Sequence, residues 1–240
     1  MSALLDVENL QKRFGSLRAL DGFSLTAERG KLTGLIGPNG AGKTTAFACI
    51  SGATKPTAGK IVFDGGEIEG KPYHRVARLG IARTYQVVQT FAEMTVLEAV
   101  TVGALMRHPR LSDARAKAAD TIEFVGLGPK RDTLGKSLTI ADKKRLEVAR
   151  ALATEPALLL LDEVMAGLTP AEAQAAVALL REILGRGITI VMVEHVMEVL
   201  MPIADHIVVL SAGKTIFSGT PHAAANDPAV LEAYLGPPIT

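Results

Sequence analysis

The stretch GPNGAGKT, from Gly37 to Thr44, has the residue types and the spacing of a loop that binds phosphate. It fits the pattern G-x-x-x-x-G-K-[ST]. In such a loop the glycines let backbone N–H groups wrap a phosphate chain, Lys43 reaches the β- and γ-phosphates, and the hydroxyl of Thr44 serves Mg²⁺. A glycine turn without a ligand is the alternative. The candidate nucleotide-binding residues are Gly37, Pro38, Asn39, Gly40, Ala41, Gly42, Lys43, Thr44 and Thr45.

Two neighbouring carboxylates could complete this chemistry. Asp162 and Glu163 close the apolar run ALLLLDE, which begins at Ala157. At the end of a buried strand, Asp162 suits the Mg²⁺ side of the site, and Glu163 can polarise the water that attacks the γ-phosphate. The competing interpretation is a pair of solvated loop residues. Together with the phosphate loop, these carboxylates predict a nucleoside triphosphatase.

Short apolar strands must position these groups. KLTGLIG, at 31–37, runs into the phosphate loop, and a helix is expected from about Gly42. The runs ALLLLDE and ITIVMVEH, at 188–195, are continuous rather than alternating, which is typical of a parallel sheet covered on both faces. Ligands bind at the carboxyl ends of such strands. We therefore expect one edge of the sheet to gather Asp162, Glu163, Glu194 and His195.

The flanking sequence predicts an α/β fold in a single domain over 1–240. Alternating stretches in the first 30 residues suggest a small antiparallel sheet, and 206–219 reads as a hairpin that turns at 211–213. Asp227 and Pro228 predict a short closing helix. From 91 to 154 the sequence is helical, so a helical insertion of about these residues is expected within a core of about 1–90 and 155–240.

Composition restricts the function further. The 240 residues carry 26 basic and 25 acidic side chains, a net charge of +1, which gives no footprint for nucleic acid. One cysteine, Cys49, excludes an internal disulfide framework, fits a reducing compartment and is expected to pack as a small apolar residue. We find no signal peptide, and the apolar runs are far shorter than the roughly 20 residues of a spanning helix.

The order of the motifs resembles the nucleotide-binding domain of ABC transporters over nearly the whole chain. GPNGAGKTT is followed by RTYQ at 83–86, by SLTIADKKRLEVARAL at 137–152 running into LLLLDE, and by His195 after ITIVMVE. The resemblance implies a P-loop NTPase (RecA-like) core with a small antiparallel β subdomain and an inserted helical subdomain. It also implies ATP and Mg²⁺ as the bound groups. A small-molecule kinase is disfavoured, since it would leave the His195 and Thr139 segments without a task.

The resemblance also implies roles for individual residues. Phe14 would stack on adenine, Gln86 would link the metal and the attacking water to the helical subdomain, and Glu163 would be the general base. His195 would contact the γ-phosphate, and residues 166–169 would form a loop that crosses a dimer interface. The metal-side residues are then Thr44, Gln86 and Asp162. Taken alone, Phe14 could equally be a core aromatic, Gln86 a loop residue and His195 a hydrogen-bonded structural group.

A departure from the family pattern occurs where ABC proteins usually read LSGGQ. This chain reads LTIAD, from Leu138 through Thr139, Ile140 and Ala141 to Asp142. In the family, this segment contacts the γ-phosphate held by a partner subunit. Backbone N–H groups remain at the helix start and Thr139 keeps a hydroxyl, but Ile140 adds bulk and Asp142 adds negative charge unless it caps its own helix. We therefore expect this segment to contact the γ-phosphate of the partner subunit more weakly than LSGGQ would. A sandwich dimer with a non-identical ATP-binding partner tolerates such a weak contact best.

The segments RTYQVVQTFAEMTVLEAV, DEVMAGLTPAE and PAVLEAYLG resemble importers of branched-chain and other hydrophobic amino acids. The implied partners are two membrane-spanning permease subunits, fed by a substrate-binding protein, with this chain peripheral at the cytoplasmic face of the inner membrane. Residues 87–94 and the helical insertion are expected to dock on the permeases. Urea or amide uptake, lipopolysaccharide export and a soluble ABC ATPase outside transport remain alternatives.

Overall fold

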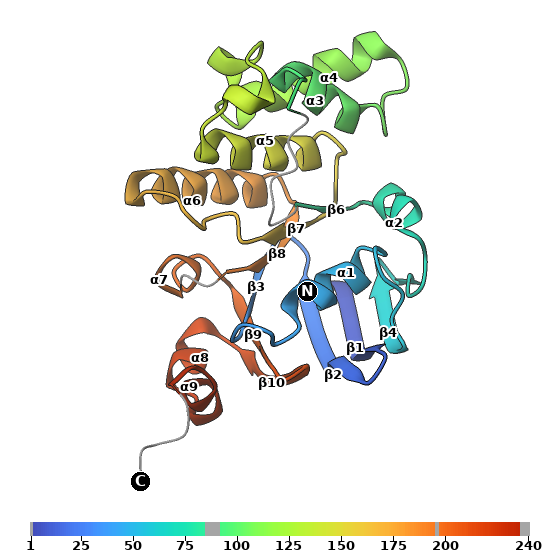
Figure 1. The fold of residues 1–240 in the computed structure, drawn as a ribbon, viewed down its shortest axis with the longest axis vertical. Helices are drawn as coiled ribbons and strands as arrows, with labels where there is room; N and C mark the ends of the chain where they lie inside the picture. The colour runs from blue at the N-terminus through green and yellow to red at the C-terminus, as the bar shows by residue number, and fades with distance from the viewer. Residues whose placement is uncertain (1, 85–91, 195–196, 236–240) are drawn as a thin grey trace.

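A computed structural model describes residues 2–84, 92–194 and 197–235. Figure 1 shows two sheets in the lower and central parts of the view and a stack of helices at the upper end. The sheets do not share a strand, and α1 (Lys43–Ile50) lies beside both. The described part of the chain is therefore an α/β protein, as the sequence predicts.

The first sheet is antiparallel and comes from the N-terminal part of the chain. Its order is β2-β1-β4-β5. Leucine, valine and phenylalanine recur along these strands, and their side chains form one buried face. This confirms the small sheet expected at the N-terminus and extends it by two strands. The bounds are β1 (Ala3–Phe14), β2 (Leu17–Glu28), β4 (Ala58–Phe63) and β5 (Gly66–Glu67).

The second sheet has the order β10-β9-β3-β8-β7-β6, and its strands from β9 to β6 run parallel. Every residue of β3, β7 and β8 is buried, as expected for continuous apolar strands covered on both faces. The hairpin expected near the C-terminus is present as the antiparallel pair β9 and β10. The bounds are β3 (Leu32–Ile36), β6 (Ile81–Arg83), β7 (Leu158–Asp162), β8 (Thr189–Val193), β9 (His206–Ser211) and β10 (Lys214–Gly219).

Helices flank the second sheet and close the C-terminal part. Thr169 caps α6 through a capping box with Glu172, and Pro170 occupies its first turn. The closing helix α9 follows Asp227, which accepts hydrogen bonds from the N–H groups of Ala229 and Val230, as predicted. The bounds are α2 (Tyr73–Leu79), α6 (Pro170–Gly185), α7 (Met197–Leu200), α8 (Pro221–Asn226) and α9 (Pro228–Leu235).

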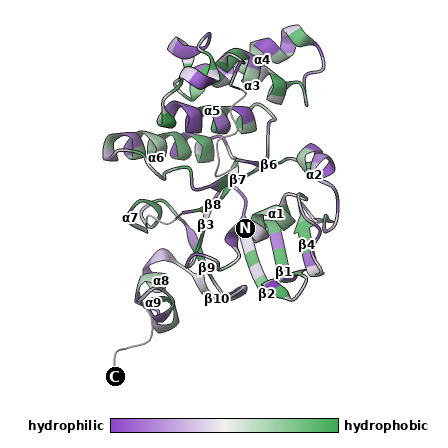
Figure 2. Cartoon of the chain, in the orientation of Figure 1, coloured by the Kyte–Doolittle hydropathy of each residue, from purple (hydrophilic) through white to green (hydrophobic). Residues whose placement is uncertain are grey.

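Between β6 and β7 the described chain is helical. It forms α3 (Val96–Ala104), α4 (Leu111–Phe124), two short 3₁₀ turns at 128–130 and 135–137, and α5 (Ile140–Leu152). Figure 2 shows hydrophilic and hydrophobic residues mixed along α4 and α5. The buried residues of α4, such as Ala114, Ala118 and Ile122, recur at helical spacing and so share one face. That these helices form a separate subdomain stays a prediction. In the described ranges, no helix is both long and apolar enough to traverse a bilayer.

Candidate functional site

The phosphate loop lies between β3 and α1, in the strand–loop–helix context that the motif requires. Gly42 is at the N-cap of α1 with φ 109°, and a Cβ there would lie 2.4 Å from the carbonyl oxygen of Ala19. At Gly37, with φ 149°, a Cβ would lie 2.0 Å from the carbonyl oxygen of Leu210. Both positions therefore need glycine, because of backbone conformation and of close contact.

The loop opens onto a cleft of about 410 Å³. Phe14 is half exposed at its rim, so it is not a core aromatic, and the ammonium of Lys12 lies 4.7 Å from the centre of its ring. An exposed aromatic beside a glycine-rich loop offers a flat apolar face next to a phosphate cradle. The lining residues are Phe14, Leu17, Arg18, Ala19, Asn39, Gly40, Ala41, Gly42, Lys43, Thr44, Thr45 and Glu163.

Lys43 is buried beneath this loop. Its Nζ donates to the carbonyl oxygens of Gly37 at 2.7 Å and Pro38 at 3.0 Å. Burial lowers the pKa of Lys43, and the carboxylates of Glu163 and Asp162 oppose that shift. Lys43 is thus a partly desolvated cation near two carboxylates. A phosphate group bound in the loop would give its ammonium a closer anionic partner.

Asp162 ends β7 and is 1% exposed. Burial raises its pKa, and the guanidinium of Arg83, 2.9 Å from Oδ2, opposes this. The Asp162 N–H donates to the hydroxyl of Thr84, so the last residue of β6 and the residue after it both contact Asp162. Its other oxygen, Oδ1, is buried and has no hydrogen-bond partner among the residues that the structure describes. A carboxylate oxygen in this position is an available ligand.

Glu163 follows Asp162 but has a different environment. It is partly exposed and lines the cleft, and its backbone has φ 51°, in the left-handed region. Its N–H donates to the carbonyl oxygen of Val193 at 2.9 Å, which joins it to the end of β8. One carboxylate is thus buried and paired while the next faces the cleft, as expected for a metal-side group beside a water-activating group.

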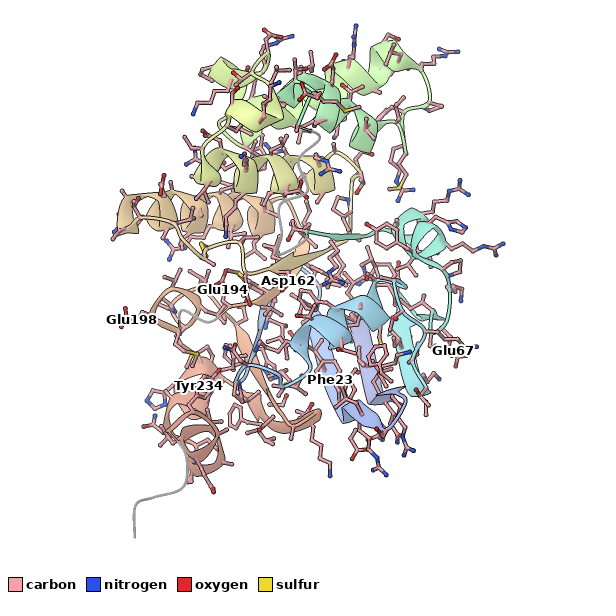
Figure 3. The ribbon with its side chains drawn as sticks, viewed as in Figure 1. Phe23, Glu67, Asp162, Glu194, Glu198 and Tyr234 are labelled. Carbon is pink, nitrogen blue, oxygen red and sulfur yellow. The ribbon has the colours of Figure 1, made fainter. Side chains whose placement is uncertain are left out.

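The predicted convergence at the sheet edge holds for the carboxylates that the structure describes. Figure 3 shows Asp162 and Glu194 close together at the ends of β7 and β8. Glu194 is 1% exposed, and its Oε1 accepts a hydrogen bond from the Met165 N–H at 2.7 Å. Glu194 therefore fixes the turn that follows Glu163. The fourth predicted member, His195, lies outside the described residues, and so does Gln86, the predicted link to the metal.

The predicted cap of α5 is present. Thr139 occupies the N-cap, its oxygen accepts from the Asp142 N–H at 3.2 Å, and its hydroxyl donates to Asp142 Oδ2 at 2.6 Å. Burial raises the pKa of Asp142, but hydrogen bonds from Lys130 and Thr139 lower it more. The ion pair with Lys130 thus absorbs the added negative charge of the LTIAD segment. Leu138 and Ala141 are buried, whereas Ile140 is 64% exposed.

Some partners of the site were not identified in the sequence. Arg83 and Thr84 belong to the RTYQ segment at 83–86, in which the resemblance implies a role for Gln86 alone. Lys130 is too distant in sequence from Asp142 for a local pattern to reveal the pair. Burial raises the pKa of Tyr234 on α9, and a hydrogen bond with the backbone of Gly37 opposes this shift. The closing helix thus contacts the phosphate loop, which the spacing of motifs does not predict.

A parallel α/β sheet with a lysine-bearing glycine loop after β3 and a carboxylate pair after β7 defines a P-loop nucleotide-binding protein. The sequence profile of the family described as ABC transporter matches residues 20–166. The chain belongs to this family. A second profile, described as branched-chain amino acid ATP-binding cassette transporter, matches residues 214–236, which include β10, α8 and α9.

Known proteins resemble the chain over nearly its full length. It is 39% identical to the high-affinity branched-chain amino acid transport ATP-binding protein BraF of Pseudomonas aeruginosa, over 97% of this chain and 98% of that protein. It is 34% identical to the lipopolysaccharide export ATP-binding protein LptB of Haemophilus influenzae, over 98% of each. A crystal structure of the ADP conformation of an ATP-binding cassette of an ABC transporter matches with TM-score 0.89 at 31% identity, covering 99% of this chain and 100% of that one.

Proposed function

We propose that this protein is the ATP-binding and ATP-hydrolysing subunit of an ABC importer for branched-chain or other hydrophobic amino acids. The observation that carries the proposal is the cleft in which Phe14, the phosphate loop and Glu163 face one space. The likeness to BraF over almost all of both chains supports the amino-acid class, and so does the branched-chain profile matched by the C-terminal elements.

ATP would lie along the phosphate loop with its adenine against Phe14. Residues 39–45 would offer backbone N–H groups to the phosphate oxygens, and the start of α1 would add its positive end. Lys43 would exchange the carbonyl oxygens of Gly37 and Pro38 for the β- and γ-phosphates. That exchange replaces neutral acceptors by anionic ones, which strengthens each hydrogen bond in a partly buried site.

The residues present fit a magnesium ion. Mg²⁺ in nucleotide sites takes one or two protein oxygens and completes its shell with water and phosphate oxygens. Thr44 lines the cleft and Asp162 has an oxygen, Oδ1, that no described group bonds, so these would hold the ion directly or through water, with Gln86 as the third predicted contact. When bound, the ion would neutralise charge that develops on the β- and γ-phosphates.

Glu163 would act as the general base. A partly exposed carboxylate on the cleft wall can accept a proton from a water aligned with the γ-phosphate, whereas Asp162, buried and paired with Arg83, cannot exchange protons as freely. His195, next along the chain after Glu194, would hold the γ-phosphate from the neighbouring strand end. These roles are testable one by one because each residue comes from a different element or has a different neighbour.

A second ATP-binding subunit would complete each site. Neither Thr139 nor Ile140 lines the cleft of their own chain, so a phosphate contact from the start of α5 has to be made to another chain. Residues 166–169 would cross between the subunits, and Ala166 and Gly167 are exposed. Because the Thr139 hydroxyl already donates to Asp142, it would have to turn to reach a phosphate. We therefore propose a sandwich dimer with a non-identical partner that supplies the stronger contact.

Permease subunits would dock on a groove between the second sheet and the helical part. The groove has a volume of about 290 Å³ and is bordered by residues from α2, β6, α3 and α5, with Tyr73 and Val102 exposed beside it. Predicted docking at residues 87–94 falls largely outside the described residues. A substrate-binding protein would then act through the permeases, and the subunit would lie peripherally on the cytoplasmic face of the inner membrane.

The test is ATP-driven uptake in proteoliposomes that contain this chain, a second ATP-binding subunit, the two permeases and the binding protein. We expect leucine to accumulate only with ATP, and the binding protein loaded with leucine to raise ATP hydrolysis. Recovery of the chain with soluble scaffold proteins and no membrane subunits would instead support a soluble ABC ATPase. Stimulation by lipopolysaccharide or urea, without response to any hydrophobic amino acid, would overturn the amino-acid assignment.

A further inference from the structure

The backbone of Glu163 needs support that its own strand does not provide. A residue other than glycine is strained in the left-handed region, and Glu163 has φ 51°. Its N–H is bonded to Val193, as described above. Its carbonyl oxygen accepts two hydrogen bonds, from the Ala166 N–H at 3.3 Å and from Lys144 Nζ at 2.7 Å. The shorter of these bonds comes from a charged side chain on α5.

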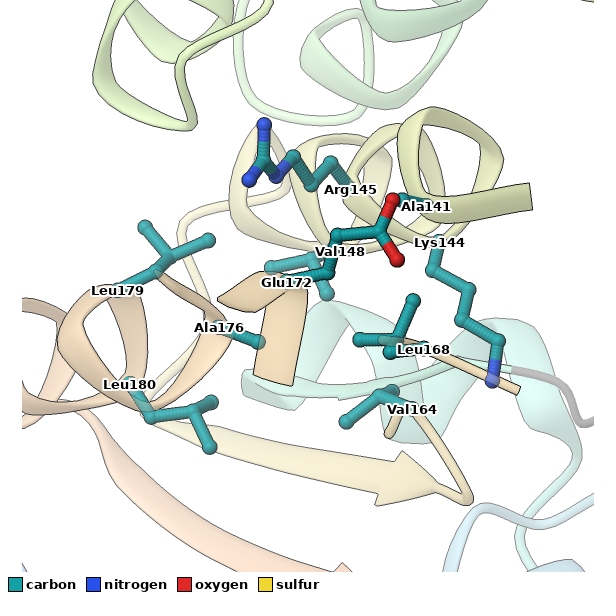
Figure 4. A pocket seen from close by; sticks show the side chains of 10 residues that line it. All are labelled: Ala141, Lys144, Arg145, Val148, Val164, Leu168, Glu172, Ala176, Leu179 and Leu180. Atoms are coloured by element: carbon teal, nitrogen blue, oxygen red, sulfur yellow. The ribbon is translucent and has the colours of Figure 1, made fainter. Parts of the chain in front are cut away.

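Lys144 reaches this carbonyl across the space between α5 and the turn after β7. Figure 4 shows its side chain extending from α5 toward the region of Val164 and Leu168. The lysine borders a small cavity of about 30 Å³ with mainly apolar neighbours, such as Ala141 and Val148. Burial lowers the pKa of Lys144, and the carboxylates of Glu194 and Glu163 oppose this shift. The ammonium group is thus partly desolvated, and it interacts with the carboxylate of Glu194, which fixes the turn, and with that of Glu163.

We propose that Lys144 is a positioning residue for Glu163. The inference rests on the proposed ATPase function, in which Glu163 is the general base. A hydrogen bond from a charged donor is stronger than one between neutral groups and can offset the strain of one left-handed residue. The bond from Lys144 can therefore decide which conformation Glu163 adopts. With the carbonyl held on one side, the carboxylate of Glu163 faces the cleft on the other.

Lys144 acts through Glu163 and not on the nucleotide. It does not line the cleft, and its hydrogen bond goes to a backbone atom of the base. It is also one helical turn after Ile140, at the exposed start of α5. A partner that presses on this start therefore acts on the element that holds Glu163. Lys144 thus links two parts of the proposed mechanism. It lies on the helix whose start would contact the other subunit, and it bonds Glu163, the proposed base of its own subunit.

The test is Lys144→Met in the assembled complex, with Lys144→Arg as the conservative variant and Lys143→Met as the matched control on the same helix. We expect Lys144→Met to lower kcat about 10- to 100-fold, the range for a displaced catalytic group, while KM for ATP changes less than about twofold. Lys144→Arg should restore most of kcat, since a guanidinium can donate to the same carbonyl. Lys143→Met should match the wild type.

A double-variant cycle separates positioning from a general structural role. In a Glu163→Gln background the base is already lost, so adding Lys144→Met should change the residual single-turnover rate little. Three results would overturn the inference: a full additional loss of rate in the Glu163→Gln background, a wild-type kcat in Lys144→Met, or a KM for ATP that rises as much as kcat falls.

A second readout does not depend on activity. Hydrogen exchange at the amides of Glu163 and Met165 should quicken in Lys144→Met and not in Lys143→Met. If the wild-type complex does not hydrolyse ATP, the proposed function fails, and this measurement still decides whether Lys144 holds the turn. Unchanged exchange at both amides would show that it does not.

Discussion

At the scale of single residues, the two neighbouring carboxylates differ in what surrounds them, and that difference supports the separate roles proposed for them. Asp162 is buried against Arg83, whereas Glu163 is turned to the cleft by a left-handed backbone. Sequence spacing placed both at the end of one strand and assigned them different roles. It could not supply Arg83 or Lys144 as their partners, because these contacts depend on how β6 and α5 pack against β7.

The first prediction separates binding from chemistry. Lys43→Ala should abolish productive ATP binding, because it removes the ammonium that would bind the β- and γ-phosphates. In the free chain this ammonium bonds the carbonyl oxygens of Gly37 and Pro38. Glu163→Gln should bind ATP normally and stop turnover, since it removes a group that acts in the transition state. Nucleotide affinity and steady-state hydrolysis measure the two effects. Glu67→Gln, a distant exposed control, should behave as wild type (Figure 3). Near-normal turnover in Glu163→Gln would remove its assignment as base.

The second prediction concerns the buried pair of Arg83 and Asp162. Arg83→Met should lower the free energy of unfolding by about 3–5 kcal/mol near neutral pH, because it leaves a buried carboxylate without its cation. Arg83 opposes the burial that raises the Asp162 pKa, so its removal should raise that pKa further. The folded variant then holds the proton more tightly than the unfolded chain does.

The sign of the pH dependence follows from that tighter proton. The stability deficit of Arg83→Met should be full above the raised pKa of Asp162. It should shrink as pH falls toward the ordinary value for aspartate, about 4. Denaturant unfolding of wild type, Arg83→Met and Arg83→Lys at several pH values tests this, with Arg83→Lys losing less. A deficit that does not vary with pH would point to lost packing instead.

At the scale of elements, the helix α5 has a capped start, which we propose faces a phosphate of another subunit, and a body that packs in the core. Its cap and its apolar face could be predicted because both are local: Thr139 precedes Asp142 by three residues, and Leu146 and Ala149 recur at helical spacing. The extension of the first sheet by β4 and β5 could not, since those strands come from residues 58–67 and pair with β1 over a long separation. Local patterns define helices and their caps, while distant pairing sets the edges of sheets.

The third prediction tests both ends of this helix. Thr139→Ala should destabilise the isolated chain by about 1 kcal/mol through loss of the cap. In the assembled transporter it should slow hydrolysis by roughly ten- to a thousand-fold, if the hydroxyl serves the partner's phosphate as proposed. Thermal unfolding and ATPase assays measure these, and Thr139→Ser, which keeps a hydroxyl, is the control. Indifference of the complex to Thr139→Ala would show that this helix start does not serve a phosphate in trans.

The fourth prediction places the permeases on the groove bordered by α2, β6, α3 and α5. Cysteines at Val102, which borders this groove, and at Met94, in the segment predicted to dock, should crosslink to the permeases in the complex, and Leu231→Cys on α9, at the opposite end of Figure 1, should not. The native Cys49 does not interfere, because it is buried and burial raises its pKa to about 11. If Met94→Cys and Val102→Cys stay reactive and uncrosslinked in the complex, docking lies elsewhere.

At the scale of the whole molecule, the chain presents a cleft and a helix start that does not line it. The LTIAD segment is capped and its charge is paired within the chain, yet Ile140 remains exposed. The motifs predict that the phosphate loop and the LTIAD segment serve different subunits, but they do not reveal that Lys130 neutralises Asp142. Assembly with another subunit remains a proposal about how the two surfaces are used.

The fifth prediction follows from that division. The purified chain alone should hydrolyse ATP slowly, and addition of a partner that retains both glycines of the LSGGQ segment should raise the rate at least about tenfold, the contribution of one added donor to the transferring phosphate. Size-exclusion chromatography with ATP and the Glu163→Gln variant should show a mixed dimer. Full activity as a stable monomer would contradict the sandwich arrangement.

The strand order has a consequence for how the protein is made. β3, which leads into the phosphate loop, pairs with β8 and β9, more than 150 residues later in the chain. During synthesis the ribosome releases β3 long before either neighbour exists, so its apolar residues have no sheet to join until the chain is almost complete. Nucleotide therefore cannot assist folding early. The last third of the polypeptide decides whether the first third acquires its binding loop, and premature termination there would leave β3 exposed to aggregation.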